Sequence, residues 1–209
     1  MSAFKALMVD VDGVVIKPRP GGWAADLEAD LGLRATDLQI YFFAPHWNDI
    51  VLGRAGLHAR LAPVLEEIAP HLTSQRLTAY WFEKDAQLDT ALLDDIADVR
   101  ANGIEVHLAT VQEHLRATYL WTTLGLGERF DAMHYAADLG AKKSDPAFYA
   151  AVEARTGFAP AELLLIDDTP ANVEAARAAG WDGAIWDGSE RLAAVLGRVG
   201  LTAPPPRDR

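Results

Sequence analysis

Candidate strands and helices alternate along the second half of the chain. Short apolar runs occur at residues 104–109, 130–135, 163–166 and 184–186, and the segments between them have apolar residues at helical spacing. Strands separated by helices form right-handed βαβ units, whose strands lie parallel in one sheet. The pattern therefore predicts an α/β fold with a parallel sheet flanked by helices.

An earlier apolar run, ALMV at residues 6–9, has the composition of a strand that is buried on both faces. Residues 17–88 separate it from the other candidate strands; they begin with the breaker cluster KPRPGG and continue with helical spacing. We therefore expect a core domain of residues 1–16 and 89–202, and a small all-helical cap domain of residues 17–88 inserted after the first strand. The tail, residues 203–209, contains three consecutive prolines and is predicted to be disordered.

Carboxylates directly follow two of the predicted buried strands. The first strand leads into DVDG at residues 10–13, and the run at 163–166 leads into two aspartates at 167–168. A charge at the end of a buried strand requires a partner, a metal ion or a shifted pKa. For the first strand by itself, an ordinary acidic turn is an equally good interpretation, because Asp and Gly are common in turns.

Ligands bind beyond the carboxyl ends of the strands in open parallel sheets of this kind. The side chains expected to meet there are Asp10, Asp12, Thr110, Lys142 or Lys143, Asp167 and Asp168. Carboxylates clustered without Cys or His favour a hard cation with oxygen ligands, which indicates Mg²⁺. A metal beside a lysine and a hydroxyl suits a phosphoryl group, because all three stabilise its oxygens.

Composition and charge exclude several other functions. The chain has no cysteine, which excludes disulfides, thiolate nucleophiles and cysteine-ligated metals. Its net charge of −11 argues against nucleic acids and anionic membranes as partners. No apolar run is long enough to span a membrane, and the N-terminus lacks the layout of a signal peptide, so we expect a cytoplasmic protein.

Four short motifs, in order, resemble those of the haloacid dehalogenase-like (HAD) superfamily. They are DVDGV at residues 10–14, Thr110, Lys143 in the segment KSDP, and DDTPANV at residues 167–173. Each motif is weak by itself, whereas four in the right structural context are specific. The resemblance covers nearly the whole chain except the tail, and the helical insertion is similar to the small cap of subfamily I. It implies a Rossmann-like core and a phosphatase-like hydrolase.

The resemblance implies a role for each motif residue. Asp10 would be the nucleophile that forms an aspartyl-phosphate, and Asp12 would be the general acid and then the general base. Thr110 and Lys143 would hold the phosphoryl oxygens. Because Asp10 and Asp12 are two residues apart, their side chains would share one side of an extended backbone.

The resemblance also implies a bound Mg²⁺ ion. Its ligands would be Asp10, the backbone carbonyl of Asp12, and Asp168, with Asp167 supporting the site through water or an outer contact. Adjacent residues at a strand end point to different sides, so the roles of Asp167 and Asp168 could be reversed.

Two positions depart from the pattern of the family. Val111 follows Thr110 where related enzymes usually have an Asn that helps to position substrate, and the phosphate-binding hydroxyl is kept. Ser144 replaces a Pro, and Lys143 still precedes the start of the next helix. Lys142 is the alternative phosphate-binding lysine, although the register of the motif favours a surface role for it.

Several cap side chains could face the crevice and contact the leaving group. Core or surface positions are the commoner fate of these residue types, and we favour that interpretation for each of them. His107, within a predicted strand, is likewise expected to be packed or hydrogen-bonded. The cap candidates are His46, Arg54, Trp81, Phe82 and Lys84.

The leading prediction is Mg²⁺-dependent hydrolysis of a small phosphorylated metabolite, with sugar phosphates among the candidates. A phosphomutase keeps every motif and is one alternative. A 2-haloacid dehalogenase needs neither the metal nor the acid, so Asp12 and the Asp167-Asp168 pair argue against it. A non-catalytic binding or regulatory module on the same fold is the alternative from another class, but such a protein would be expected to have lost Asp10 or Lys143. The individual substrate and the oligomeric state are left open.

Overall fold

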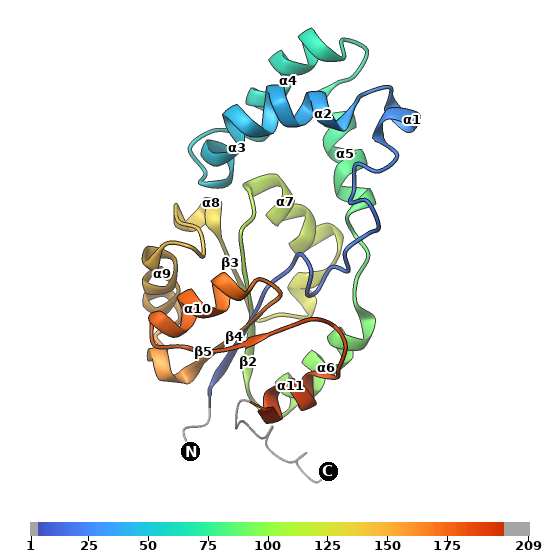
Figure 1. Cartoon of the computed structure of the whole chain (residues 1–209). Coiled ribbons are helices and arrows are strands. Elements are labelled where there is room, and N and C mark those ends of the chain that lie inside the picture. The colour runs from blue at the N-terminus through green and yellow to red at the C-terminus, as the bar shows by residue number, and fades with distance from the viewer. Residues whose placement is uncertain (1–3, 199–209) are drawn as a thin grey trace.

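The computed structural model describes residues 4–198, so the disorder predicted for residues 203–209 lies outside the described residues. Five strands form one parallel sheet in the order β3-β2-β1-β4-β5, with β1 in the centre (Figure 1). The predicted α/β fold is therefore confirmed. The strands are β1 (Ala6–Val9), β2 (Glu105–Thr110), β3 (Ala132–Tyr135), β4 (Leu163–Asp167) and β5 (Asp182–Ile185).

Helices connect the strands, and some of them begin at the signals visible in the sequence. Asp145 accepts a hydrogen bond from the N–H of Ala147 at 2.9 Å, and Pro146 is the first helical residue, so this Asp-Pro pair starts helix α9. The helical segment between β2 and β3 begins as a short α-helix and continues as a π-helix. The helices of this part are α6 (Thr90–Ala101), α7 (His114–Thr118), η2 (Tyr119–Thr123), η3 (Leu126–Glu128), α8 (Ala136–Leu139), α9 (Pro146–Thr156), η4 (Pro160–Glu162), α10 (Pro170–Ala178) and α11 (Leu192–Arg198).

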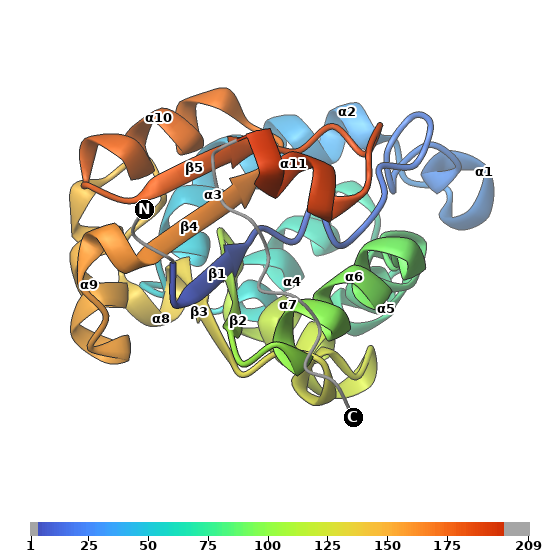
Figure 2. The same ribbon diagram turned by 90° about the horizontal axis from the view of Figure 1, so that it is seen from below.

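Each face of the sheet has its own buried core, because successive side chains of a strand point to opposite faces. Leu7 and Val9 of β1 belong to a cluster with α6 and α11, whereas Ala6 and Met8 belong to a cluster with α9 and α10. Figure 2 shows these two pairs of helices on opposite sides of the sheet. Coverage of both faces explains why β1 is apolar at every position.

The last strand differs from its prediction at residues 184–186. Strand β5 already begins at Asp182, although Asp and Gly have low strand propensity. Pairing decides the outcome, because Asp182 lies opposite Leu164 and Gly183 lies opposite Leu165. A Cβ at Gly183 would lie 2.9 Å from Cγ1 of Val173, so the glycine lets α10 pack closely on the strand. Helix α11, which follows, was not predicted.

The inserted segment is helical and lies above the carboxyl ends of the strands (Figure 1). Its buried apolar side chains, from Leu27 to Phe82, form a hydrophobic cluster of their own. No helix within residues 4–198 is both long and apolar enough to cross a lipid bilayer. The helices of the segment are α1 (Leu27–Leu31), α2 (Ala35–Leu38), η1 (Gln39–Phe43), α3 (Ala44–Val51), α4 (Leu57–Ile68) and α5 (Ser74–Lys84).

The two connections between the inserted segment and the sheet run side by side. Ile16 and Leu88 form an antiparallel bridge. On either side of it, the N–H of Lys17 donates to the carbonyl of Gln87 at 2.8 Å, and a second backbone bond of 2.8 Å joins residues 89 and 15. These bonds support our proposal of a core domain (1–16 and 89–202) and a cap domain (17–88).

Two histidines of neighbouring strands are buried against each other. His107 of β2 and His134 of β3 are 4% and 5% exposed, and Nδ1 of His107 lies 3.1 Å from Nε2 of His134. The other ring nitrogen of His107 lies 3.0 Å from Glu105 Oε2, so His107 is packed and hydrogen-bonded as predicted. Burial, assisted by the charge of His107, lowers the pKa of His134 to about 4.

This histidine pair predicts a loss of stability in mild acid. An unfolded histidine titrates near pH 6.5, whereas folded His134 stays neutral until about pH 4. The free energy of unfolding is therefore unaffected by His134 above pH 6.5. It falls by up to about 3 kcal/mol towards pH 4, because His134 takes up a proton in the unfolded chain but not in the folded protein over this range. When urea denaturation is measured between these pH values, the free energy of unfolding should depend less steeply on pH in His134→Gln than in the parent protein. The same change at the exposed His71 should leave the slope in place, and an unchanged slope in His134→Gln would contradict the prediction.

Candidate active site

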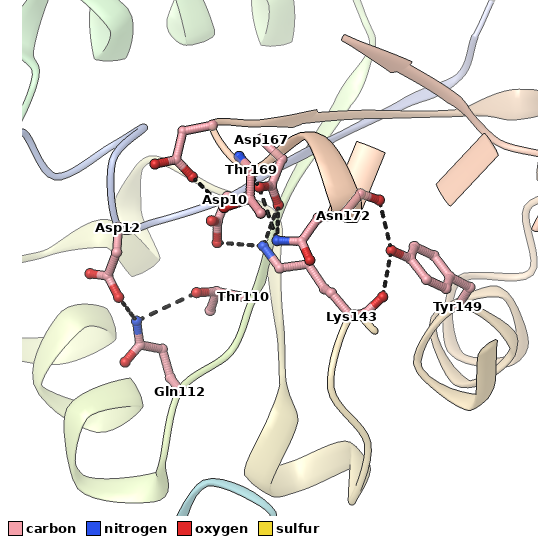
Figure 3. A network of polar contacts seen from close by, with 10 residues as sticks. Asp10, Asp12, Thr110, Gln112, Lys143, Tyr149, Asp167, Thr169 and Asn172 are labelled. Carbon is pink, nitrogen blue, oxygen red and sulfur yellow. Dashed lines mark hydrogen bonds and ion pairs between the residues drawn. The ribbon is translucent and has the colours of Figure 1, made fainter. Parts of the chain in front are cut away.

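A buried lysine joins two aspartates at the carboxyl ends of β1 and β4. Nζ of Lys143 lies 2.7 Å from Oδ1 of Asp10 and 2.5 Å from Oδ2 of Asp167 (Figure 3). Asp10 directly follows β1, and its N–H donates to the carbonyl of Ile166 in β4 at 3.0 Å. Asp10, Lys143 and Asp167 are only 7%, 1% and 0% exposed. The structure thus brings these three predicted site residues into direct contact.

Further donors at the start of helix α10 hold Asp167. Its Oδ1 accepts from the N–H of Thr169 at 2.9 Å and from Nδ2 of Asn172 at 3.0 Å. The hydroxyl of Tyr149 lies 2.9 Å from the carbonyl of Lys143 and 3.0 Å from that of Asn172, and it donates to one of them at a time. Burial raises the pKa of Tyr149, so this hydroxyl keeps its proton. These contacts fix the backbone on both sides of the Lys143–Asp167 pair.

Negative charge exceeds positive charge in this cluster. The carboxylates of Asp10, Asp167 and Asp168 lie close together, and Lys143 pairs with the first two. Burial raises the pKa of Asp10 to about 6, with Lys143 opposing the rise and Asp167 adding to it. Burial also raises the pKa of Asp168. A divalent cation would supply the missing positive charge and keep Asp10 ionised.

The three carboxylates fit a hard divalent cation. Ligand oxygens of Asp10, Asp167 and Asp168 lie within 4.8 Å of one another, and a set of oxygen donors suits Mg²⁺. Gly13 makes room for Asp168, because a Cβ at this glycine would lie 2.1 Å from Asp168 Oδ2. Gly13 also has a φ of +80°, a conformation that side chains rarely adopt.

The second aspartate of the first motif lies outside this carboxylate cluster. Asp12 is exposed, and its Oδ2 accepts a hydrogen bond from Nε2 of Gln112 at 2.7 Å. Nε2 of Gln112 also lies 3.5 Å from Oγ1 of Thr110, the buried last residue of β2 (Figure 3). Strand β1 ends at Val9, and Asp12 forms an isolated parallel bridge with Ile16 in the loop that follows.

Three polar residues of this network were missed by sequence reasoning. Gln112 follows Thr110 by two residues, and Asn172 lies inside the fourth motif. Their closeness in sequence to motif residues could have indicated that both belong to the site. Tyr149 belongs to helix α9 and meets Asn172 across 23 positions of sequence. Only the packing of α9 beside α10 reveals it.

The cap side chains considered for contacts with the leaving group lie in packed or surface positions. Phe82 is 6% exposed, and Trp81 stacks on Trp23 with ring centroids 5.0 Å apart. Lys84 forms an ion pair of 2.9 Å with Asp30. These positions agree with the interpretation favoured from the sequence. The other two candidates, Arg54 and His46, lie beside Asp49 and Phe42 respectively.

Contacts between cap and core lie close to the site. Nζ of Lys142 donates to Oδ1 of Asn48 in the cap at 2.7 Å, so Lys143 is the lysine that meets the carboxylates. A Cβ at Gly53 in the cap would lie 2.3 Å from the carbonyl oxygen of Ala137 in the core. The cap loop at Gly53 therefore rests directly on helix α8.

Comparison with known proteins decides the family. The haloacid dehalogenase-like hydrolase family model matches residues 4–180. The chain belongs to this family. The resemblance and the hydrolase class predicted from four short motifs are confirmed. This HAD-like hydrolase is 25% identical over 186 residues to a phosphoglycolate phosphatase from Pectobacterium atrosepticum, and the match covers 86% of this chain and 79% of that protein.

Solved structures share the fold of this HAD-like hydrolase. A HAD family enzyme from Bacteroides thetaiotaomicron, in complex with magnesium and inorganic phosphate, superposes with a TM-score of 0.78 at 16% identity, over 93% of this chain and 100% of that one. A defluorinating L-2-haloacid dehalogenase superposes with a TM-score of 0.64 at 19% identity, over 87% and 80% of the two chains. At identities this low, the comparison shows a common fold. That fold occurs both in the magnesium- and phosphate-bound HAD family enzyme and in the dehalogenase.

Proposed function

We propose that this HAD-like hydrolase is a Mg²⁺-dependent phosphatase that cleaves small phosphate monoesters through an aspartyl-phosphate. The observation that carries the proposal is the buried pairing of Lys143 with Asp10 and Asp167, next to the carboxylate of Asp168. The relative named phosphoglycolate phosphatase supports a small phosphorylated metabolite as substrate. Sugar phosphates belong to the same chemical class.

Lys143 and the hydroxyl of Thr110 would bind the phosphoryl oxygens, since both can donate to them. Asp10, the backbone carbonyl of Asp12 and Asp168 would hold Mg²⁺. We assign the supporting role to Asp167, because both of its oxygens already accept hydrogen bonds from the protein. When bound, Mg²⁺ would neutralise charge on the phosphoryl oxygens.

Two steps complete the reaction with the residues of this chain. A carboxylate oxygen of Asp10 attacks phosphorus, the bond from phosphorus to the ester oxygen breaks, and Asp12 gives its proton to that oxygen. An alcohol leaves and an aspartyl-phosphate remains. Asp12, now ionised, takes a proton from water as the water oxygen attacks phosphorus. The bond to Asp10 breaks, inorganic phosphate leaves, and Asp10 is again a carboxylate while Asp12 is again a carboxylic acid.

A substrate panel tests this function. Purified protein should hydrolyse p-nitrophenyl phosphate, phosphoglycolate or sugar phosphates with Mg²⁺ present, and EDTA should remove the activity, because the carboxylate cluster then lacks its compensating charge. Other products distinguish the alternatives. Isomerised sugar phosphates would indicate a phosphomutase, and metal-independent halide release from 2-haloacids would indicate a dehalogenase. Absence of all turnover would leave the non-catalytic binding module and overturn the proposal.

A further inference from the structure

Gln112 is a buried residue whose side-chain amide lies beside the proposed general acid. Gln112 is 5% exposed, and its Nε2 lies 2.7 Å from Asp12 Oδ2. The N–H of Ala137 donates to the backbone carbonyl of Gln112 at 3.1 Å. The next residue, Glu113, caps helix α7 by accepting from the N–H of Leu115 at 2.9 Å. These contacts hold the backbone on which the Gln112 side chain is carried, and the amide itself bonds to Asp12 and lies 3.5 Å from Oγ1 of Thr110.

The bond between Gln112 and Asp12 makes the two oxygens of Asp12 unequal. An amide N–H can only donate, so Oδ2 must act as an acceptor. A carbonyl oxygen accepts better than the oxygen of a hydroxyl group. When Asp12 is neutral, its proton is therefore placed on Oδ1, and Oδ2 keeps the carbonyl character that the bond to Gln112 favours.

Charged neighbours of Asp12 are engaged elsewhere. Arg116 of helix α7 is 2% exposed and donates to the carbonyls of Phe82 and Asp85. It also pairs with the carboxylate of Asp85 at 3.4 Å. Gln112 is thus the neighbour that the structure bonds directly to the Asp12 carboxyl group.

We propose that Gln112 is a positioning residue that turns Oδ1 of Asp12, with its proton, towards the leaving oxygen of the substrate. This inference rests on the proposed phosphatase function and assigns a role that the four motifs do not contain. As the bond from phosphorus to the ester oxygen breaks, the proton passes from Oδ1 to that oxygen and Asp12 becomes a carboxylate. Gln112 then stabilises the charge on Oδ2 through the same N–H.

Leaving-group dependence is the readout that separates this role from a general structural one. Poor leaving groups need the proton most, whereas p-nitrophenolate departs without it. In Gln112→Met, which keeps the size of the side chain and removes the donor, kcat/KM should fall about 10²-fold for alkyl phosphates and by a much smaller factor for p-nitrophenyl phosphate. The plot of kcat/KM against leaving-group basicity should therefore steepen. Gln39→Met, an exposed position in the cap, is the matched control and should keep the parent slope.

A double-mutant cycle provides the second test. In an Asp12→Ala background, Gln112→Met should cause no further loss of kcat/KM, because the group through which Gln112 acts is gone. Equal losses with and without Asp12, or an unchanged leaving-group slope in an active enzyme, would overturn this inference alone. A parent protein inactive on every phosphate ester would overturn the proposed function and this inference together.

Discussion

Replacing Asp10 by Asn is expected to abolish phosphate-ester hydrolysis, with a fall in kcat of about 10⁴-fold or more, the scale on which loss of a nucleophile acts. The amide is nearly the same size as the carboxylate, but it cannot form the aspartyl-phosphate. Folding should not suffer, since the change removes one of three clustered negative charges from a buried position. Initial rates with p-nitrophenyl phosphate and Mg²⁺ measure the first effect, and urea denaturation measures the second.

The control is the same substitution at an exposed carboxylate. Asp98→Asn on helix α6 should keep the parent rate and stability. A second readout follows the phosphoryl group itself. Acid-quenched parent protein should carry a phosphate on Asp10 after mixing with substrate, and the variant should carry none. Turnover that survives in Asp10→Asn would reject Asp10 as the nucleophile.

Replacing Lys143 by Met should cause the largest loss of stability among the site variants. Lys143 is 1% exposed, and its removal leaves Asp10 and Asp167 facing each other without their shared cation. Uncompensated buried charges of this kind cost about 3–5 kcal/mol of unfolding free energy. Urea denaturation in EDTA should show this loss at pH 8, and turnover should be lost as well.

The loss of unfolding free energy in Lys143→Met should be smaller in mild acid than at pH 8. The direction of this change follows from the pKa of Asp10. The folded pKa of Asp10, about 6, lies above the ordinary value of 3.8, so ionised Asp10 opposes folding above pH 6. As the pH falls through 6, the folded state takes up the proton first and this penalty is relieved. Without Lys143, which lowers the pKa of Asp10, the relief should begin at a higher pH.

Lys142→Met is the matched control for this prediction. It makes the same chemical change one residue earlier, where the ammonium group donates to the amide oxygen of Asn48 in the cap. The expected cost is below about 1 kcal/mol, as for other solvent-accessible polar contacts. Equal costs for the two lysine variants would contradict the central position that the structure gives to Lys143.

Sequence by itself determined the class of the fold and most of the proposed chemistry. Apolar runs such as those at residues 6–9 and 163–166 are typical of strands buried on both faces, as in a parallel sheet covered by helices. The carboxyl ends of parallel strands meet at one edge, so Asp10, Thr110 and Asp167 were expected to converge. Local rules also predicted the Asp-Pro start of helix α9, because capping depends on neighbouring residues.

Tertiary structure decided what local rules cannot reach. Strand β5 forms over Asp182 and Gly183 because pairing with β4 overrides their low strand propensity. Asp10 pairs with Lys143 whereas Asp12 bonds to Gln112, and the two-residue spacing does not reveal these separate partners. The neighbours that orient the site, Gln112 and Tyr149, come from other segments of the chain. Their side chains meet Asp12 and the Lys143 loop only after sheet and helices have packed, since such contacts depend on three-dimensional distance and not on spacing along the sequence.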